Sequence, residues 1–165
     1  MKKMFLSITT IVLLLICPNG LQAQDTAKNP DQLKLAQKYF VGTWQLMSND
    51  TIFAWDMKPD GNVIEEIDYK IVNGVQSVDS YWSYSYNPKE NNFYIFAAYV
   101  NGGYQTLIGS FIAEDKWSQK IVEKFNADKP DITVEFVFDT DTSGTLTAFS
   151  KDGAKTWEGK ITKIK

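Results

Sequence analysis

The side chains that could carry out chemistry in this sequence are carboxylates, lysines, hydroxyls and aromatic rings. The 165 residues include 17 Lys and Arg together, all of them Lys, and no His. Without His, the chain has no imidazole base for a serine or cysteine nucleophile and no imidazole ligand for a metal. Without Arg, it has no bidentate clamp for a phosphate or carboxylate group. Composition therefore favours binding over catalysis.

Two pairs of adjacent acids come nearest to the paired carboxylates that hydrolyse glycosides. Glu65 and Glu66 lie in a segment with strand character, where adjacent side chains point to opposite faces. Glu114 and Asp115 lie at an expected turn. Because neither pair presents two carboxylates to one space, we expect no enzyme, no catalytic residue and no cofactor. A carboxylate-based hydrolase is the least favoured alternative, and it requires two carboxylates that face each other across a cleft.

Glu65 shares its strand face with apolar neighbours, among them Val63, Ile67 and Tyr69. An inward-facing acid among apolar side chains would be a candidate site residue. A β-bulge or exposure to solvent is the simpler interpretation of Glu65.

The elements that must position these side chains are one short helix and a series of strands. Asn29 and Pro30 suit a helix cap and first turn, and residues 31–40 carry apolar side chains at helical spacing. Gly42 ends this pattern. From Thr43 onward the apolar residues alternate with polar ones, and turn residues separate the runs. The strands predicted in this way are 43–49, 51–58, 62–72, 75–86, 93–101, 104–113, 116–125, 131–139, 144–150 and 156–164.

The short connections between these strands determine the expected architecture. Asn73-Gly74 and Asp152-Gly153 between alternating runs are strong hairpin signals. No connection is long enough for a crossover helix, so the strands should pair antiparallel. Closing the sheet removes its edges. We therefore expect an all-β domain over residues 31–165, an up-and-down barrel of about 8–10 strands with one N-terminal helix. A β-sandwich is the alternative.

The N-terminal segment has the composition of a secretory signal peptide. Residues 1–23 combine a basic start, an apolar run over 5–16 and a small-residue site that ends at Ala23. The apolar run is shorter than the ~20 residues that a membrane-spanning helix needs. We expect cleavage after Ala23, a flexible leader over 24–30, and a secreted or periplasmic monomer. A lipid anchor at Cys17 is the minor alternative.

Charge restricts the partners of the exported chain. The formal net charge is −3, and the only Cys lies within the expected signal peptide. An acidic chain is a poor match for nucleic acid or for an anionic membrane surface. We therefore expect no nucleic-acid partner and no disulfide in the mature domain.

Two motifs near the C-terminus are interpreted as turns. Asp139 to Gly144 fits the first half of a calcium loop, but Ser150 stands where the bidentate glutamate belongs, so we expect no metal site. The segment Ser150 to Trp157 resembles an Asp-box, S-x-D-x-G-x-T-W, with Ala154 in place of the glycine. In families that carry it, the box is a hairpin element. The resemblance implies structural roles for Ser150, Asp152, Thr156 and Trp157. A sialidase is excluded by the single copy and the missing Arg.

A third motif follows the expected helix and opens the first expected strand. Gly42 and Trp44 form a G-x-W sequence that resembles the signature of lipocalins and other calycins. With the closing S-x-D-G-x-K-T-W stretch, the chain looks most like uncharacterised bacterial lipocalin-like domains. The resemblance implies that Trp44 plugs one end of a barrel. The Arg that covers this Trp in lipocalins is absent, and Lys160 or Lys163 is the candidate substitute.

These observations favour a small-molecule carrier. Aromatic side chains with interspersed Ser and Thr suit a largely apolar pocket. The candidate ligand-binding residues are Trp82, Tyr84, Phe96, Tyr99, Tyr104 and Phe111. We expect an exported protein that holds a small hydrophobic or amphipathic ligand inside the barrel. The alternative is a cell-envelope barrel that binds a protein or glycan partner through exposed aromatics, and a filled interior would favour it.

Overall fold

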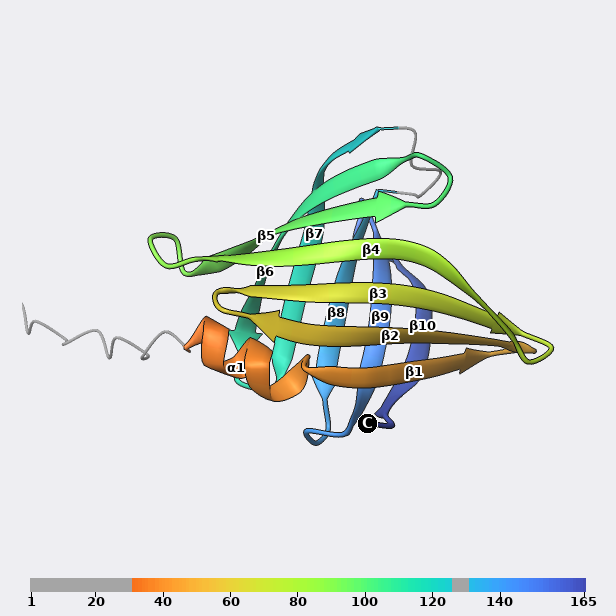
Figure 1. Ribbon diagram of the computed structural model, residues 1–165. Helices are drawn as coiled ribbons and strands as arrows, with labels where there is room; N and C mark the ends of the chain where they lie inside the picture. The colour runs from red at the N-terminus through yellow and green to blue at the C-terminus, as the bar shows by residue number, and fades with distance from the viewer. Residues whose placement is uncertain (1–30, 126–130) are drawn as a thin grey trace, which may run out of the picture.

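A computed structural model of the chain describes residues 31–125 and 131–165 (Figure 1). The expected signal peptide (1–23), the leader (24–30) and Cys17 lie outside the described residues. The described part consists of one helix and a sheet that closes on itself.

Helix α1 spans Gln32–Tyr39 and starts later than the sequence suggested. Its N-cap is Asp31, whose carboxylate accepts a hydrogen bond from the backbone N–H of Lys34 at 3.1 Å. The expected cap, Asn29, lies outside the described residues. Ala36 and Tyr39 are buried, so this face of the helix packs against the barrel.

Ten strands follow in the described residues, each within two residues of the predicted limits. They are β1 (Gly42–Ser48), β2 (Thr51–Asp60), β3 (Val63–Val72), β4 (Val75–Asn87), β5 (Asn92–Tyr99), β6 (Tyr104–Ala113), β7 (Lys116–Phe125), β8 (Ile132–Phe138), β9 (Ser143–Ser150) and β10 (Lys155–Lys163).

The sheet is a closed up-and-down barrel, as predicted. Each strand pairs antiparallel with its neighbour in sequence, and β1 pairs with β10 to complete the closure. This topology excludes the β-sandwich. A closed antiparallel barrel with one short helix is compatible with a lipocalin-like fold, although it has ten strands in the described residues where lipocalins have eight.

Helix α1 covers one end of the barrel and is fixed there by a buried amide. The Gln32 side chain donates to the carbonyl oxygen of Phe111 at 2.9 Å and accepts from its N–H at 2.6 Å. Just after the helix, the Phe40 ring inserts among aromatic rings of the barrel and meets Trp117 edge-on, with ring centres 4.9 Å apart. Aromatic side chains therefore fill this end of the interior.

Trp44 lies within the filled end and is almost completely buried. Its indole N–H donates to the Phe40 carbonyl oxygen at 3.1 Å, which ties the start of β1 to the end of the helix. The Lys163 ammonium group lies 5.0 Å from the centre of the Trp44 ring. Of the two lysines considered from the sequence as the group that covers Trp44, Lys163 therefore lies next to its ring. Lys160 instead donates a hydrogen bond to the Thr145 hydroxyl on β9.

The backbone at position 42 can accommodate only glycine. Its φ of +126° is a conformation that other residues rarely adopt, and a Cβ there would lie 2.5 Å from the Lys165 carbonyl oxygen. In the G-x-W sequence, the glycine is therefore required by the backbone conformation, and the tryptophan is required for packing at the filled end.

The hairpin between β9 and β10 contains the residues of the Asp-box. Ser150 donates hydrogen bonds to the Asp152 carboxylate and, at 3.0 Å, to the Ala154 carbonyl oxygen. Thr156 donates to the Ala148 carbonyl oxygen at 3.1 Å, across the two strands. These contacts close the turn.

The segment that resembles half a calcium loop forms the connection between β8 and β9. Its hydroxyl groups bond to one another, with Thr140 2.9 Å from Ser143 and 3.2 Å from Thr142. Within residues 31–125 and 131–165, no group of three or more Cys, Asp or Glu residues is arranged to hold a metal ion.

Gly109 on β6 tests how tightly the filled end is packed. A Cβ at Gly109 would lie 2.2 Å from the fully buried Trp117 ring. We expect Gly109→Ala to lower the free energy of unfolding by about 1–3 kcal/mol, because the ring has no free space to move into. Urea denaturation measures the loss, and Ser110→Ala, the next residue along β6, is the control. Equal stability of the two variants would contradict this packing.

Candidate functional site: a cavity in the barrel

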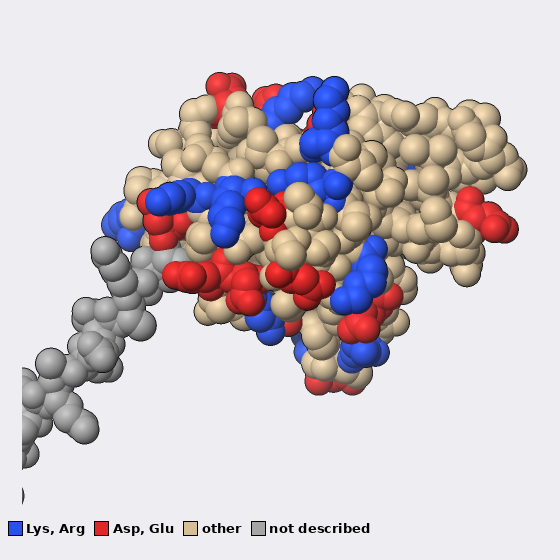
Figure 2. Space-filling view, turned by 90° about the horizontal axis from the view of Figure 1, so that it is seen from below, with Lys and Arg blue, Asp and Glu red and all other residues tan. Residues whose placement is uncertain are grey.

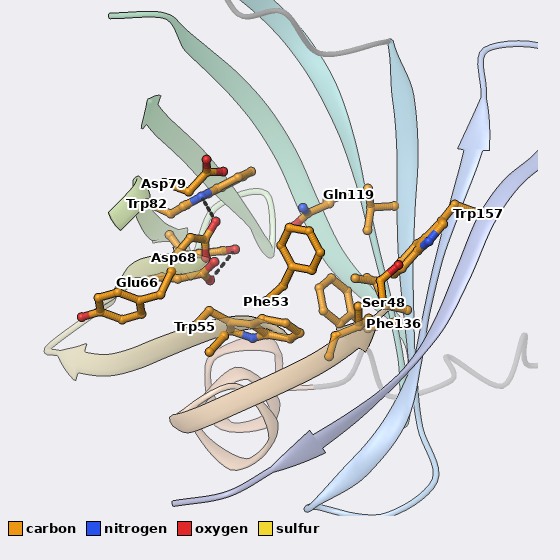
Figure 3. A pocket seen from close by; sticks show the side chains of 16 residues that line it. Ser48, Phe53, Trp55, Glu66, Asp68, Asp79, Trp82, Gln119, Phe136 and Trp157 are labelled. Carbon is orange, nitrogen blue, oxygen red and sulfur yellow. Dashed lines mark hydrogen bonds between the residues drawn. The ribbon is translucent and has the colours of Figure 1, made fainter. Parts of the chain in front are cut away.

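A cavity of about 400 Å³ occupies the barrel at the end away from α1 (Figure 3). Its volume falls within the ~300–1,000 Å³ range of small-molecule sites. The lining residues are Leu46, Ser48, Phe53, Ala54, Trp55, Glu66, Asp68, Tyr69, Asp79, Trp82, Tyr84, Gln119, Val134, Phe136, Leu146 and Trp157.

The cavity has an apolar side and a polar side. Phe136, Val134 and Leu146 come from β8 and β9, and Trp55 and Phe53 from β2. The acidic side chains come from β3 and β4. Figure 3 shows Glu66 and Asp68 on one side of the space and Phe136 and Trp157 on the other. A molecule in the cavity would therefore contact aromatic rings at one end and carboxyl groups at the other.

The polar side is built around two carboxyl groups on one strand. Glu66 and Asp68 are two residues apart on β3, so both side chains point inward. The Asp68 carboxylate accepts hydrogen bonds from Ser80 at 2.7 Å and from the Trp82 indole N–H at 2.8 Å. Glu66 is almost completely buried and accepts from the Tyr84 hydroxyl at 2.9 Å. Donors on β4 thus orient both carboxyl groups.

The two carboxyl groups hold protons differently. Burial, and then the negative charge of Asp68, raise the pKa of Glu66 well above its usual value. Burial also raises the pKa of Asp68, but hydrogen bonds from Glu66, Ser80 and Trp82 oppose this rise. Burial raises the pKa of Tyr84 well above its usual value, so its hydroxyl remains a donor. Of the two carboxyl groups, Glu66 therefore has the stronger tendency to keep its proton, while hydrogen bonds favour the charged form of Asp68.

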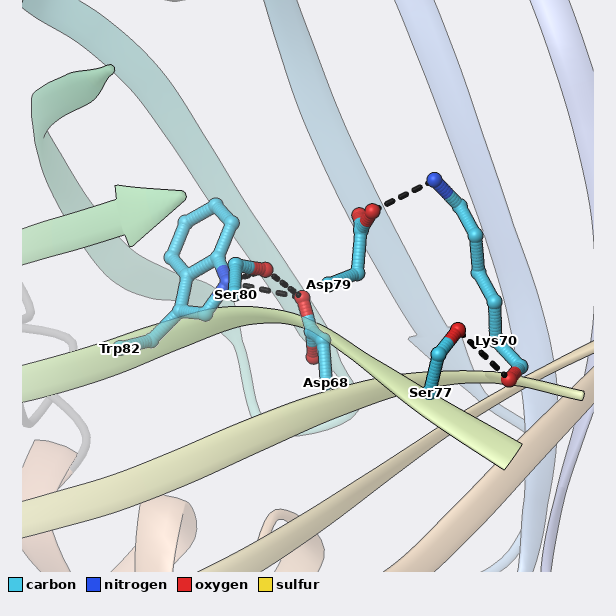
Figure 4. A network of polar contacts seen from close by, with 6 residues as sticks. All are labelled: Asp68, Lys70, Ser77, Asp79, Ser80 and Trp82. Carbon is cyan, nitrogen blue, oxygen red and sulfur yellow. Dashed lines mark hydrogen bonds and ion pairs between the residues drawn. The ribbon is translucent and has the colours of Figure 1, made fainter. Parts of the chain in front are cut away.

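A third acid lies at the open end of the same polar side. Asp79 on β4 forms an ion pair with Lys70 of β3, and Ser77 donates to the Lys70 carbonyl oxygen (Figure 4). A bulge between Asp68 and Tyr69 shifts the register of β3 and β4 here. The ion pair neutralises Asp79, whereas the neighbouring Asp68 is held by hydrogen-bond donors alone.

One face of the open end, the face seen in Figure 2, is largely uncharged. Figure 2 shows few charged side chains where the β1–β2 and β3–β4 turns lie. Met47, Val72 and Val75, at the ends of these strands, are all exposed.

Three of the six expected ligand-binding residues lie in or next to the cavity. Trp82 and Tyr84 are part of its lining. Tyr99 meets the Trp82 ring edge-on, with ring centres 6.3 Å apart, and supports it from β5. These three residues share the inner faces of β4 and β5.

The other three residues lie elsewhere. Phe111 belongs to the filled end, where it packs against Phe40 and Trp117. Phe96 and Tyr104 stack on each other, 5.8 Å between ring centres, and Phe96 is 47% exposed on the outer surface. Strand alternation explains this: Phe96 and Tyr104 have the opposite parity to the inward-facing residues of their strands.

The acidic pair was not identified from the sequence. Glu65, considered there as an inward acid, is exposed, and its neighbour Glu66 faces the interior with Asp68. The i, i+2 spacing of Glu66 and Asp68 was the available signal, since such residues share a strand face. Which face points inward depends on how the barrel closes. Trp157, expected only as a hairpin residue, also lines the cavity.

The outer surface carries a shallow groove beside the exposed aromatics. It has a volume of about 380 Å³ and runs across β4 to β7. Its lining includes Ser83, Ser85, Tyr94, Phe96, Thr106, Ile108 and Val122. No charged residue belongs to this lining, so the groove has less means than the cavity to select a ligand.

Comparison of the sequence with profiles of known protein families and with curated proteins gives no match. Among the described residues, no helix has the length and apolar character needed to cross a membrane. The class of protein is therefore defined by fold and site: an antiparallel barrel with a cavity compatible with ligand binding.

The carboxyl pair should make stability depend on pH. Folded Glu66, which faces Asp68 and Tyr84, keeps a proton that the unfolded chain releases near the usual pKa of 4.5. The free energy of unfolding should therefore fall as pH rises above about 4.5. Glu66→Gln removes this titration, so the free energy of unfolding of the variant should increase relative to that of the wild type as pH rises. Urea denaturation from pH 4 to 8 measures the free energy of unfolding of the wild type and of the variant.

The control for this experiment is Glu65→Gln, which changes the exposed neighbour on the same strand. It should follow the wild-type profile. A constant difference between the wild type and Glu66→Gln across the pH range would contradict a neutral Glu66 in the folded protein.

Proposed function

We propose that this protein is exported and binds a small apolar or amphipathic molecule in the barrel cavity, without catalysing a reaction. The observation that carries the proposal is the cavity of about 400 Å³, in which aromatic walls adjoin a few buried, hydrogen-bonded polar groups. This combination is characteristic of small-molecule sites. The lipocalin-like resemblance supports it, because Trp44 and Lys163 close the opposite end of the barrel.

A hydrolase fits the carboxyl groups less well. Glycoside hydrolysis needs two carboxyl groups on either side of the bond to be broken. Glu66 and Asp68 instead lie two residues apart on one face of one strand. They therefore approach a bound molecule from the same side, as binding groups do.

Recognition of an envelope protein or glycan on the outer surface is the second candidate. The exposed ring of Phe96, stacked on the partly buried ring of Tyr104, favours it, since exposed apolar patches commonly mark interaction sites. The cavity is preferred because it combines burial with oriented hydrogen-bonding groups, which the outer groove lacks. Both candidates are compatible with a monomer.

Binding of a neutral apolar dye tests the proposal. N-phenyl-1-naphthylamine should fluoresce more strongly with the protein and quench tryptophan emission, because Trp55, Trp82 and Trp157 line the cavity. Leu146→Trp, which fills part of the cavity, should weaken binding by at least about tenfold. Val134→Phe is a milder variant with the same purpose.

Phe96→Ser is the matched control, because it removes an aromatic ring from the outer surface alone. It should leave the affinity for the dye unchanged. If Phe96→Ser weakens binding and the two cavity variants do not, the outer surface is the binding site. If the wild type binds no dye, the carrier function is wrong.

A further inference from the structure

We propose that the cavity selects ligands that carry a protonated amine on an apolar, preferably aromatic, body, with Asp68 as the group that binds the ammonium. This inference rests on the proposed carrier function and specifies the ligand class of the same site. Four features of the described residues support it: the orientation of the acceptors, the missing counter-charge, the aromatic walls and the reach of Asp68.

The acceptors on the polar side outnumber the donors that remain free. The hydroxyl of Ser80 and the indole N–H of Trp82 are already used on one oxygen of Asp68, Oδ2. Among the described side chains, these two donors therefore leave the second oxygen of Asp68 to interact with Glu66 or with a ligand. A ligand that fits this surface brings N–H donors with it.

The charge of the polar side lacks a balancing cation. Three acids line the cavity, Glu66, Asp68 and Asp79, and no lysine does. Among residues 31–125 and 131–165, the ion pairs include one at Asp79, with Lys70, but none at Glu66 or Asp68. A partly buried carboxylate held only by neutral donors costs free energy that a bound cation would recover.

The remaining walls suit an organic cation better than a metal ion. Seven of the sixteen lining residues are aromatic, and Trp82 stands beside Asp68. Aromatic faces attract ammonium groups and also cover the apolar body of the ligand. A hard metal ion would need several oxygen ligands around one point, whereas the two inner carboxyl groups point into the cavity from a single strand.

Asp68 can be reached from the cavity. It is only partly buried, in contrast to Glu66, and it lies between the Lys70–Asp79 ion pair at the open end and the deeper Glu66. An ammonium group at Asp68 places the body of the ligand beside Trp55 and Phe53 of the neighbouring strand β2 and towards Phe136 across the cavity (Figure 3). Glu66, hydrogen-bonded to Asp68, acts as a positioning residue.

A matched series of indoles tests the ligand class by calorimetry. Tryptamine, 3-ethylindole and indole-3-propionate share one ring and differ in carrying a positive, a neutral or a negative side chain. We expect tryptamine to bind at least about tenfold more tightly than 3-ethylindole, and indole-3-propionate to bind most weakly.

Three variants assign the preference to Asp68. Asp68→Asn should lower the affinity for tryptamine about tenfold or more and leave that for 3-ethylindole within about twofold. Glu66→Gln should keep the preference, since its amide can donate to Asp68 as the protonated carboxyl group does. Asp56→Asn is the control: it removes an acid that bonds to Thr43 and Lys58 instead of lining the cavity.

The outcomes separate this inference from the proposed function. Equal binding of the three indoles, or a preference for the anion, overturns the amine preference while the dye still binds. Failure of all three indoles with retained dye binding also overturns it. Loss of both dye and indole binding in the folded wild type overturns the carrier function as well. The wild-type series decides the ligand class even if Asp68→Asn does not fold.

Discussion

The pairing of β1 with β10 is the constraint on which the rest of the structure depends. Trp44 opposite Lys163 and Leu46 opposite Ile161 join the first strand to the last and leave the sheet without an edge. In a closed barrel, every strand residue faces either the interior or the solvent. Closure therefore decides at once which aromatics form the filled end, which side chains line the cavity and which remain outside.

The interior of the barrel has a filled end near α1 and a hollow end, because large side chains meet at one end and line the wall at the other. At the end covered by α1, Phe40, Phe111 and Trp117 occupy the space, and Gly109 makes room for the Trp117 ring. Towards the open end, the rings stand against the wall and leave about 400 Å³ between them. A barrel of ten strands is wide enough for both arrangements, because the diameter of a barrel grows with its number of strands.

Burying two carboxyl groups side by side is unfavourable unless one is neutral and the other is well hydrogen-bonded. Here burial raises the pKa of Glu66 well above its usual value, and Asp68 accepts hydrogen bonds from Ser80 and Trp82. An apolar pair at these positions would have packed at lower cost. The amine recognition proposed above accounts for this cost, because the pair gives the otherwise largely apolar cavity one polar side.

Much of the fold could be predicted from the sequence, because turn residues and period-two alternation are local properties: the short helix, the ten strands and their antiparallel order all follow from them. Of the residues that line the cavity, Trp82 and Tyr84 were among those expected from the sequence. Glu66, Asp68 and the outward position of Phe96 were not, since alternation separates two faces without saying which is inside. Only the tertiary structure decides that, through the closure of β1 on β10 and the bulges that shift the register between strands.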